Sequence, residues 1–78
     1  MAETVVVYTQ AGCPTCYVAI EYLSGKGVTV NVRDIRRDRA ALQELVDGGF
    51  QTTPVIKIGD EMIPGFDPAR IDAALAER

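Results

Sequence analysis

The chain has 78 residues, about half of the ~150 residues of an average domain, so we expect a single domain spanning residues 1–78. It is 47% hydrophobic and 24% charged, which is typical of a soluble globular protein and excludes disordered and fibrous classes. Its formal net charge of −3 argues against a nucleic acid or an anionic membrane surface as the main partner.

The N-terminal part begins with an apolar run at residues 5–8 that lacks alternation, as expected of a strand buried on both faces. After a short loop, a helical pattern starts within the Cys-Pro-Thr-Cys segment and is stopped by Gly25 and Gly27. The residues that we expect on its buried face are Cys16, Ile20 and Leu23.

The middle of the chain predicts a second strand and a second helix. Three valines alternate with polar residues over residues 28–32, which indicates a strand with one buried face; they are Val28, Val30 and Val32. The helix that follows is predicted to be capped by Asp38 and ended by Gly48 and Gly49. We expect three of its residues to face inward, namely Leu42, Leu45 and Val46.

The C-terminal part predicts a hairpin and a last helix. Residues 55–58 and 61–63 read as two strands joined by a tight turn at Gly59-Asp60. Asp67 suits the N-cap and Pro68 the first position of the helix, whose buried stripe is predicted to be Ile71, Ala74 and Leu75. The order β-α-β-α-β-β-α predicts an α/β fold with a parallel crossover and an antiparallel hairpin in one mixed sheet.

The two cysteines, Cys13 and Cys16, are too close in sequence for their disulfide to brace the chain, and the chain has no histidine. No apolar run approaches the ~20 residues of a membrane span, and no signal peptide is recognisable, so the expected location is cytoplasmic, without a membrane partner. In that reducing compartment, closely spaced cysteines are more often catalytic or metal-binding than structural.

The position of the cysteines predicts their roles. Pro14 fits the first helical position, which makes Cys13 the N-cap and Cys16 the third helical residue. A Cys13 thiolate would accept the backbone N–H groups of Thr15 and Cys16 at the positive end of the helix dipole, which lowers its pKa from ~8.5 toward or below ~7. Cys13 is therefore the predicted nucleophile, and Cys16 the thiol that closes a disulfide with it.

Two alternatives for the cysteine pair remain open. Two buried, unreactive cysteines are one, although Pro14 and the polar Thr15 at a helix start argue against it. A carrier of soft monovalent metal ions is the other, because two thiolates suffice for such ions, whereas a tetrahedral zinc site needs more ligands. Chains of that carrier class are similar to βαββαβ and end in a strand, whereas this chain ends in a predicted helix, so we expect no metal.

Two further segments have more than one interpretation. Four arginines and two aspartates fall within residues 33–39, and this stretch is either a solvated helix start or a docking patch for an acidic partner. Pro54 marks the start or the edge of a strand, because it donates no ladder hydrogen bond. The general rarity of cis bonds favours a trans Thr53-Pro54 bond; a cis bond would turn the backbone of Thr53 toward an extended peptide.

Several motifs, in this order and at these separations, resemble the glutaredoxin family of the thioredoxin fold over nearly the whole chain. They are Val6-Val7-Tyr8-Thr9, Cys13-Pro14-Thr15-Cys16, Thr52-Thr53-Pro54-Val55 and Gly65-Phe66-Asp67. The resemblance implies a four-stranded mixed sheet of order 2-1-3-4. It also implies that Pro54 is cis and packs beside the cysteine pair.

The same resemblance implies a thiol-disulfide oxidoreductase that reduces protein or glutathione mixed disulfides. Its redox-active group would be the Cys13–Cys16 disulfide, with no metal or organic cofactor and with glutathione as a possible co-substrate. By the resemblance, Thr53 offers its backbone to the cysteinyl part of glutathione. The free amino-acid end of the ligand would be held by Gly65, Phe66 and Asp67, where the N–H groups of a helix N-terminus suit a carboxylate.

The sequence departs from glutathione-using members at two positions. Those members usually carry a lysine where Gln10 stands and a tyrosine where Thr15 stands, so we expect weak glutathione use. The chain also resembles small glutaredoxin-like redoxins that thioredoxin reductase reduces and that donate electrons to ribonucleotide reductase. The expected partners are disulfide-containing proteins, with glutathione or a thioredoxin reductase as electron donor, and the expected state is a monomer.

Overall fold

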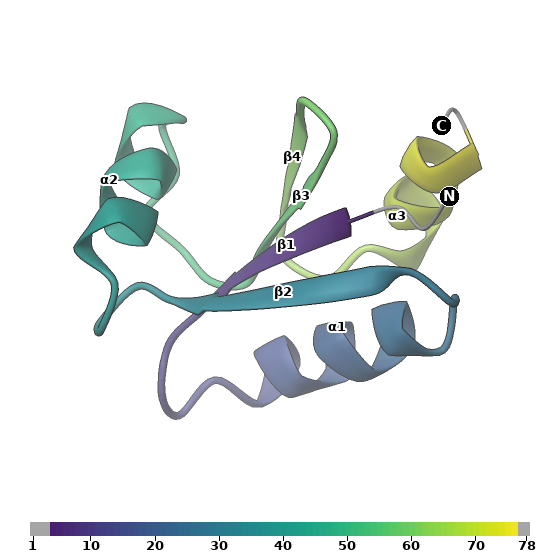
Figure 1. Ribbon diagram of the computed structural model, residues 1–78, viewed down its shortest axis with the longest axis horizontal. Helices are drawn as coiled ribbons and strands as arrows, with labels where there is room; N and C mark the ends of the chain where they lie inside the picture. The colour runs from purple at the N-terminus through teal and green to yellow at the C-terminus, as the bar shows by residue number, and fades with distance from the viewer. Residues whose placement is uncertain (1–3, 77–78) are drawn as a thin grey trace.

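The computed structural model describes residues 4–76 and has the predicted order of elements (Figure 1). The elements are β1 (Thr4–Thr9), α1 (Pro14–Ser24), β2 (Thr29–Asp34), α2 (Arg39–Asp47), β3 (Val55–Ile58), β4 (Glu61–Pro64) and α3 (Pro68–Ala76). The four strands form one sheet of order β2-β1-β3-β4, in which β1 is parallel to β2 and antiparallel to β3. The α/β fold and the strand order 2-1-3-4 are therefore confirmed. No helix within residues 4–76 is long and apolar enough to cross a membrane.

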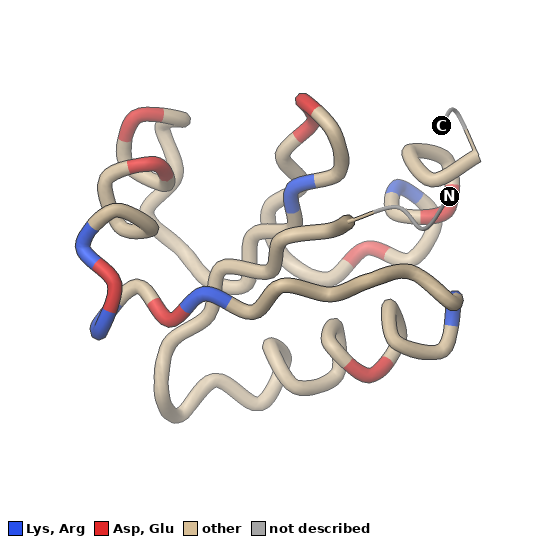
Figure 2. The backbone as a smooth tube through the Cα atoms, in the orientation of Figure 1, with Lys and Arg blue, Asp and Glu red and all other residues tan. Residues whose placement is uncertain are grey.

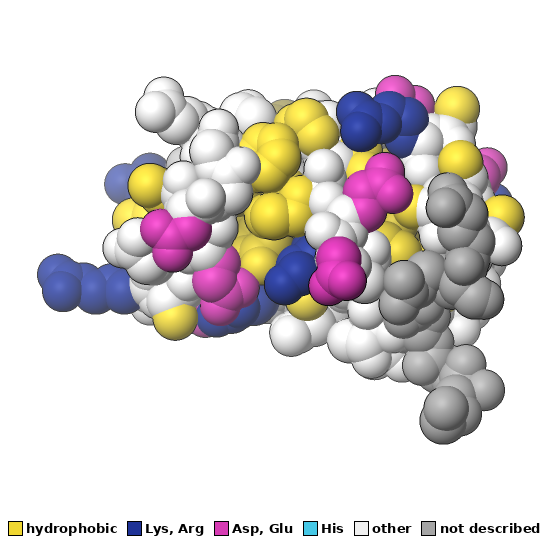
Figure 3. Space-filling model, turned by 90° about the horizontal axis from the view of Figure 1, so that it is seen from above, with side chains coloured by type: hydrophobic (Ala, Val, Ile, Leu, Met, Phe, Trp, Pro, Cys, Tyr) yellow, Lys and Arg dark blue, Asp and Glu magenta, His cyan; other side chains and the backbone are white. Residues whose placement is uncertain are grey.

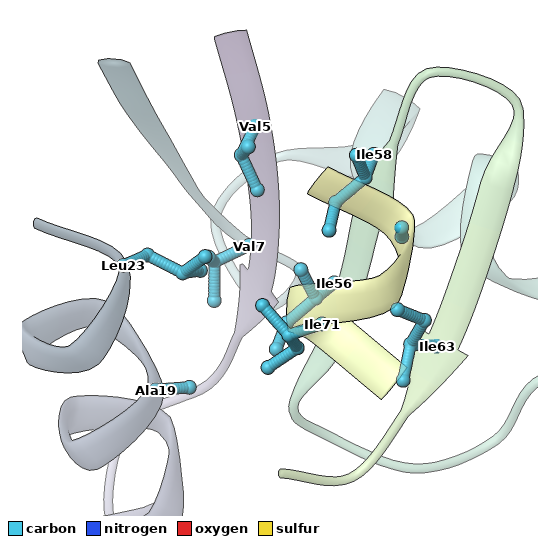
Figure 4. Packing of buried hydrophobic residues seen from close by; sticks show 9 residues of the cluster. Val5, Val7, Ala19, Leu23, Ile56, Ile58, Ile63 and Ile71 are labelled. Atoms are coloured by element: carbon cyan, nitrogen blue, oxygen red, sulfur yellow. The ribbon is translucent and has the colours of Figure 1, made fainter. Parts of the chain in front are cut away.

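The larger core lies on the face of the sheet that α1 and α3 cover. Alternate residues of the strands point to this face, where they meet one stripe of each helix (Figure 4). Its buried members are Val5, Val7, Ala19, Leu23, Ile56, Ile58, Ile63, Ile71 and Ala74. This packing fixes α1, the helix that carries both cysteines, firmly to the sheet.

The opposite face of the sheet is covered by α2 and has a smaller core. Its buried members are Tyr8, Ala41, Leu45 and Val55, and partly buried Val6, Ile35, Phe50 and Met62 pack against them. One nine-residue helix does not cover the whole face. Seen from above, hydrophobic side chains reach the surface between the end of the molecule that carries α2 and the end that carries α3 (Figure 3).

In addition to the apolar contacts, polar contacts hold α2 against the sheet. The Tyr8 hydroxyl donates a hydrogen bond of 2.7 Å to the Glu44 carboxylate, to which Arg33 donates at 2.8 Å. Arg33 also forms an ion pair of 3.1 Å with Asp38, and Asp38 caps α2 by accepting the N–H of Ala41, as predicted. The bonds from Arg33 and Tyr8 lower the pKa of Glu44, and Figure 2 shows the charges gathered at this end.

The inward face of α2 differs from the prediction. Leu42 and Val46 are 41% and 53% exposed, whereas Ala41 is buried together with Leu45, the one predicted residue that does face inward. Ala41 and Leu45 are four residues apart and form a stripe of their own, and a small Ala41 lets the helix approach the sheet closely. Leu42 and Val46 therefore lie on the outer side of the helix.

The buried face of β2 also differs from the prediction. Val28 and Val30 pack against the larger core, but Val32 is 47% exposed. β2 is an edge strand, so one side of it has no neighbour in the sheet. Residues near its end therefore depend on α1 alone for cover.

Candidate active site

The cysteine pair lies where the loop after β1 turns into α1. The loop needs a positive φ at Gly12, whose φ is 80°, before the chain enters the helix at Pro14. Cys13 is the N-cap, with extended backbone angles of φ −108° and ψ 94°, as predicted. The sequence order of loop, cysteine and proline thus positions one thiol at the helix terminus and the other one turn inside it.

The two sulfurs form a disulfide, Cys13–Cys16, and the Cα atoms of the pair are 5.3 Å apart. This separation falls in the usual range for disulfides. The two cysteines differ in exposure, because Cys13 is half-buried whereas Cys16 is 0% exposed. Only the Cys13 side of the bond therefore faces outward to an attacking thiol.

The predicted cap by the Cys13 side chain is absent in this oxidised form. Cys13 makes no side-chain cap hydrogen bond, and the N–H of Cys16 donates instead to the Cys13 carbonyl oxygen at 3.1 Å. The physical reason is that a disulfide sulfur carries no negative charge and is a poor acceptor. The predicted side-chain cap therefore concerns the reduced Cys13 thiolate, for which the N–H of Thr15 remains as a donor.

Pro54 follows a cis peptide bond with Thr53, as the family resemblance implies and against the general preference for trans. In the antiparallel register Tyr8 pairs with Val55, so Pro54 lies beside the end of β1, where the loop to Cys13 begins. Pro54 is buried and Thr53 is half-buried. The start of β3 and the end of β1 therefore meet at the edge of the sheet that leads to the cysteines.

The turn between β4 and α3 is tied to Pro54. The N–H of Gly65 donates a hydrogen bond of 2.8 Å to the Pro54 carbonyl oxygen, and Gly65 has a positive φ of 75°. Phe66 is partly buried against the larger core, where its ring contacts Tyr22 edge-to-face with centroids 5.4 Å apart. This hydrogen bond brings the predicted Gly65-Phe66-Asp67 segment to the same edge of the sheet as Thr53 and Pro54.

Asp67 acts as a helix cap, as predicted. Its carboxylate accepts the N–H of Arg70 at 3.3 Å, and its carbonyl oxygen accepts the N–H of Ile71 at 3.0 Å. The side chain is half-buried. A role in holding the ammonium group of a ligand remains a prediction.

Gln10 and Thr15 occupy different surroundings. Thr15 is exposed on the first turn of α1, whereas Gln10 is half-buried in the wall of a pocket. The residues that line this pocket are Thr9, Gln10, Ala11, Tyr17, Ile20, Val32, Asp34 and Arg37. The predicted ligand residues thus divide into two groups, because Thr53, Gly65, Phe66 and Asp67 do not line it.

Sequence reasoning missed Tyr17, Val32 and Arg37 as neighbours of the cysteine loop. They come from α1, β2 and the turn before α2, and nothing in their spacing along the chain joins them. One available signal was the large aromatic side chain of Tyr17 directly after a buried cysteine on an exposed helix face; it is 65% exposed.

The comparisons with known proteins agree with this geometry. The glutaredoxin family model matches residues 5–63. The structure resembles the crystal structure of the thioredoxin-like protein BC3987 with a TM-score of 0.84 and 31% identity, over 90% of this chain and 97% of that one. It resembles the glutaredoxin-like NrdH-redoxin from Escherichia coli with a TM-score of 0.81 and 26% identity, over 90% and 92% of the two chains.

A third similar structure is the glutaredoxin from Archaeoglobus fulgidus, with a TM-score of 0.76 and 25% identity, over 96% of this chain and 87% of that one. Among curated proteins no significant match is found. The family model covers well over half of the chain and includes both cysteines and the cis-proline. The chain belongs to the glutaredoxin family.

Proposed function

We propose that this chain is a thiol–disulfide oxidoreductase that reduces disulfides of other proteins through its two cysteines. One observation carries the proposal: the Cys13–Cys16 disulfide joins a half-buried N-cap cysteine to a fully buried cysteine in the first turn of the same helix. This asymmetry suits a cycle in which one sulfur meets the substrate and the other remains inside. A reducing compartment such as the cytoplasm is the setting in which such a dithiol stays active.

The cycle starts from the reduced pair. The Cys13 thiolate attacks one sulfur of the target disulfide, so that a mixed disulfide forms and the other target sulfur leaves as a thiolate that takes up a proton. The Cys16 thiolate then attacks the Cys13 sulfur and releases the target as a dithiol. Two electrons pass to the target, and the chain is left in the Cys13–Cys16 disulfide form.

The surroundings of the pair support these roles. The helix N-terminus stabilises negative charge on Cys13, which favours the thiolate at neutral pH. The half-buried Thr53 lies next to Pro54 at the same edge of the sheet, where its backbone is suited to pair with an extended target segment. Catalysis then needs neither a metal ion nor an organic cofactor.

The test compares Cys13→Ser with Cys16→Ser. Cys13→Ser should abolish disulfide reduction, whereas Cys16→Ser should retain the first attack and accumulate a mixed disulfide that mass spectrometry detects at the mass of protein plus target. If Cys13→Ser accumulates the adduct and Cys16→Ser does not, the roles are reversed. If neither variant nor the parent reacts with a disulfide, the chain is not an oxidoreductase.

A second, finer candidate concerns the electron donor. We infer that a thioredoxin reductase reduces this chain faster than glutathione does, and that ribonucleotide reductase is a candidate acceptor. Support comes from the similar NrdH-redoxin, whose reported activity profile is thioredoxin-like, and from Gln10, which leaves the wall of the pocket without the usual lysine. The donor assay supplies the oxidised chain with NADPH and thioredoxin reductase, or with glutathione and its reductase.

Two variants sharpen the donor assay. Gln10→Lys should raise the rate with glutathione, because it adds a cation for a ligand carboxylate. Asp67→Asn should largely keep the cap on Arg70 but lower any glutathione rate by about one to two powers of ten, because it removes a charge-assisted bond worth roughly 1.5–3 kcal/mol. Equal glutathione rates in all three proteins would contradict this ligand site while leaving the dithiol cycle intact.

The topology bears on the metal-carrier alternative. Within residues 4–76 the last element is α3 rather than a strand, and the order of the elements differs from βαββαβ. A carrier would hold a soft metal ion through both thiolates with little turnover. Tight binding of monovalent copper together with negligible disulfide reduction would overturn the enzyme proposal.

A further inference from the structure

The pocket next to the cysteine loop has an apolar part that is open to solvent. Tyr17 and Val32 are 65% and 47% exposed, and the half-buried Ile20 of α1 is a third apolar lining residue. Gln10 and Ala11, in the loop that leads to Cys13, complete its wall on the side of the disulfide. An apolar side chain seated here would belong to a molecule that also reaches Cys13.

The rim of this pocket carries unused positive charge. Arg37 lines the pocket, and Arg36 and Arg39 lie within two residues of it in the sequence; all three are exposed. Within residues 4–76 none of these three arginines forms an ion pair, whereas the nearby Arg33 is engaged by Glu44 and Asp38. In Figure 2 blue segments alternate with red ones along the turn between β2 and α2. We call Arg36, Arg37 and Arg39 the arginine turn.

Asp38, between Arg37 and Arg39 in the sequence, is engaged by Arg33 and by the N-terminus of α2, so the other carboxylate of this stretch is Asp34. It lines the pocket, and its side chain accepts the backbone N–H of Arg36 at 2.9 Å, so it shapes the turn. It offsets one of the three positive charges, which leaves the arginine turn net positive in a chain whose formal charge is −3. Charge of the opposite sign to that of the whole molecule is thus concentrated at a pocket that reaches the loop before Cys13.

We propose that the arginine turn and the pocket between Tyr17 and Val32 form a docking surface for an acidic segment of a disulfide-bearing partner protein. Carboxylates of the segment pair with the arginines, and an apolar side chain close to the target cysteine enters the pocket. This proposal rests on the oxidoreductase function and names the class of its protein substrate.

Two observations favour an acidic protein segment over other anions. A phosphate backbone would use the arginines but leave the apolar lining of Tyr17, Ile20 and Val32 unfilled, and the overall negative charge of the chain repels nucleic acid. β2 is an edge strand, so no further strand covers Val32 and an extended segment has space beside it. The surface is also continuous with the redox site through Gln10 and Ala11.

The experiment uses two synthetic peptides that contain the same internal disulfide and the same leucine beside it. One peptide carries three aspartates on one side of the disulfide, and the other carries asparagines at those positions. We measure kcat/KM for each peptide with the full chain and express the preference as the acidic-to-neutral ratio. At low salt the parent should prefer the acidic peptide by about three- to tenfold, and the preference should shrink as ionic strength rises.

Arg37→Gln and Arg70→Gln form a matched pair, because each removes one positive charge from an exposed arginine. Arg70 lies on α3 and does not line the pocket. Arg37→Gln should lower the acidic-to-neutral ratio by about two- to fivefold, and Arg70→Gln should leave it unchanged. Equal ratios in these two variants would show that the preference follows net charge alone and would overturn the docking surface.

The apolar half of the surface has its own pair. Val32→Thr and Val18→Thr change the same side chain at similar exposure, 47% and 50%, but only Val32 lines the pocket. We compare the acidic peptide with a second acidic peptide in which serine replaces the leucine. Val32→Thr should raise KM for the leucine peptide about two- to fivefold more than it does for the serine peptide. Val18→Thr should not change that comparison, and an equal effect of both variants would contradict the pocket.

A neutral small disulfide, bis(2-hydroxyethyl) disulfide, distinguishes a failure of the oxidoreductase function from a failure of the docking surface. If the parent fails to reduce this compound and both peptides, the oxidoreductase function itself is wrong. If the parent reduces all three substrates but shows an acidic-to-neutral ratio of one, only the docking surface is wrong.

Discussion

The two faces of the sheet are held together in different ways. Nine buried apolar residues join α1 and α3 to one face, whereas four such residues and a hydrogen-bonded ion network join α2 to the other. The cysteines lie on the densely packed side, and the arginine turn leads into the sparsely packed one. Few buried apolar contacts mean low local stability, so we expect a rigid redox centre next to a more adaptable recognition region.

The sharpest test of this difference removes the same side chain from each face. Leu23 on α1 and Leu45 on α2 are 0% and 1% exposed. Leu23→Ala should lower the free energy of unfolding by about 3–5 kcal/mol, because its surroundings are fully packed and collapse little around the cavity. Leu45→Ala should cost only about 2–3 kcal/mol, because partly buried neighbours such as Phe50 and Met62 can move into the space.

Urea denaturation of both leucine variants, followed by circular dichroism, gives the two values. Equal losses, or a larger loss for Leu45→Ala, would contradict the ranking of the two faces. The two denaturation slopes should agree, because a changed slope would mean that the variants differ in the surface exposed on unfolding.

The polar contacts of the two faces form a second pair. Tyr8 is 1% exposed and its hydroxyl bonds to Glu44, whereas the half-buried Tyr22 bonds to Asp72 at an exposed site. Tyr8→Phe should cost about 1–2 kcal/mol of unfolding free energy, and Tyr22→Phe less than about 1 kcal/mol, because water competes for the exposed bond. Thermal unfolding at neutral pH measures both, and a larger loss for Tyr22→Phe would break the comparison.

Alkaline pH acts on the α2 face through Tyr8. Burial, together with the bond to Glu44, raises the pKa of Tyr8 from 10.0 to about 12. Because the folded pKa lies above the unfolded one, this stabilisation is complete below pH 10 and is lost as pH rises toward 12. The stability difference between the parent and Tyr8→Phe should therefore shrink over this range in a denaturation series. A constant difference would mean that Tyr8 titrates normally.

The smallest expected effect concerns the outer side of α2. Leu42→Ser and Val46→Ser should each change the unfolding free energy by less than about 0.5 kcal/mol, because both side chains are half-exposed. By contrast, Leu45→Ala should be clearly destabilising, because it truncates a buried side chain even though it changes polarity less than the serine substitutions do. A loss above about 2 kcal/mol for either serine variant would restore the original prediction that these two residues face inward.

Much of the fold was predictable because local signals agreed with one another. The apolar run of β1, the hairpin turn and the caps at Asp38 and Asp67 each define an element, and the structure has all of them. The orientation of α2 was not predictable, because its sequence contains two competing stripes, each made of two apolar residues that lie four positions apart. Size favours Leu42 with Val46, but proximity to the sheet selects the smaller Ala41 with Leu45.

The candidate site was predictable only where neighbours in space are also neighbours in sequence. The N-cap position of Cys13 and its disulfide with Cys16 follow from their position around Pro14, whereas their roles as nucleophile and resolving thiol remain predictions. The pocket wall of Tyr17, Val32 and Arg37 needs the tertiary fold, because three separate elements supply it. The missing sulfur cap depends on redox state, which a sequence does not encode.

The complete burial of Cys16 beside a half-buried Cys13 has a kinetic consequence. A reductant that restores the dithiol and a target that consumes it must both approach through the same exposed sulfur. The two cannot occupy the chain together, so turnover should follow a ping-pong scheme, in which double-reciprocal plots at several reductant concentrations are parallel lines. Under the proposed cycle, the protein would pass electrons between two partners that never meet.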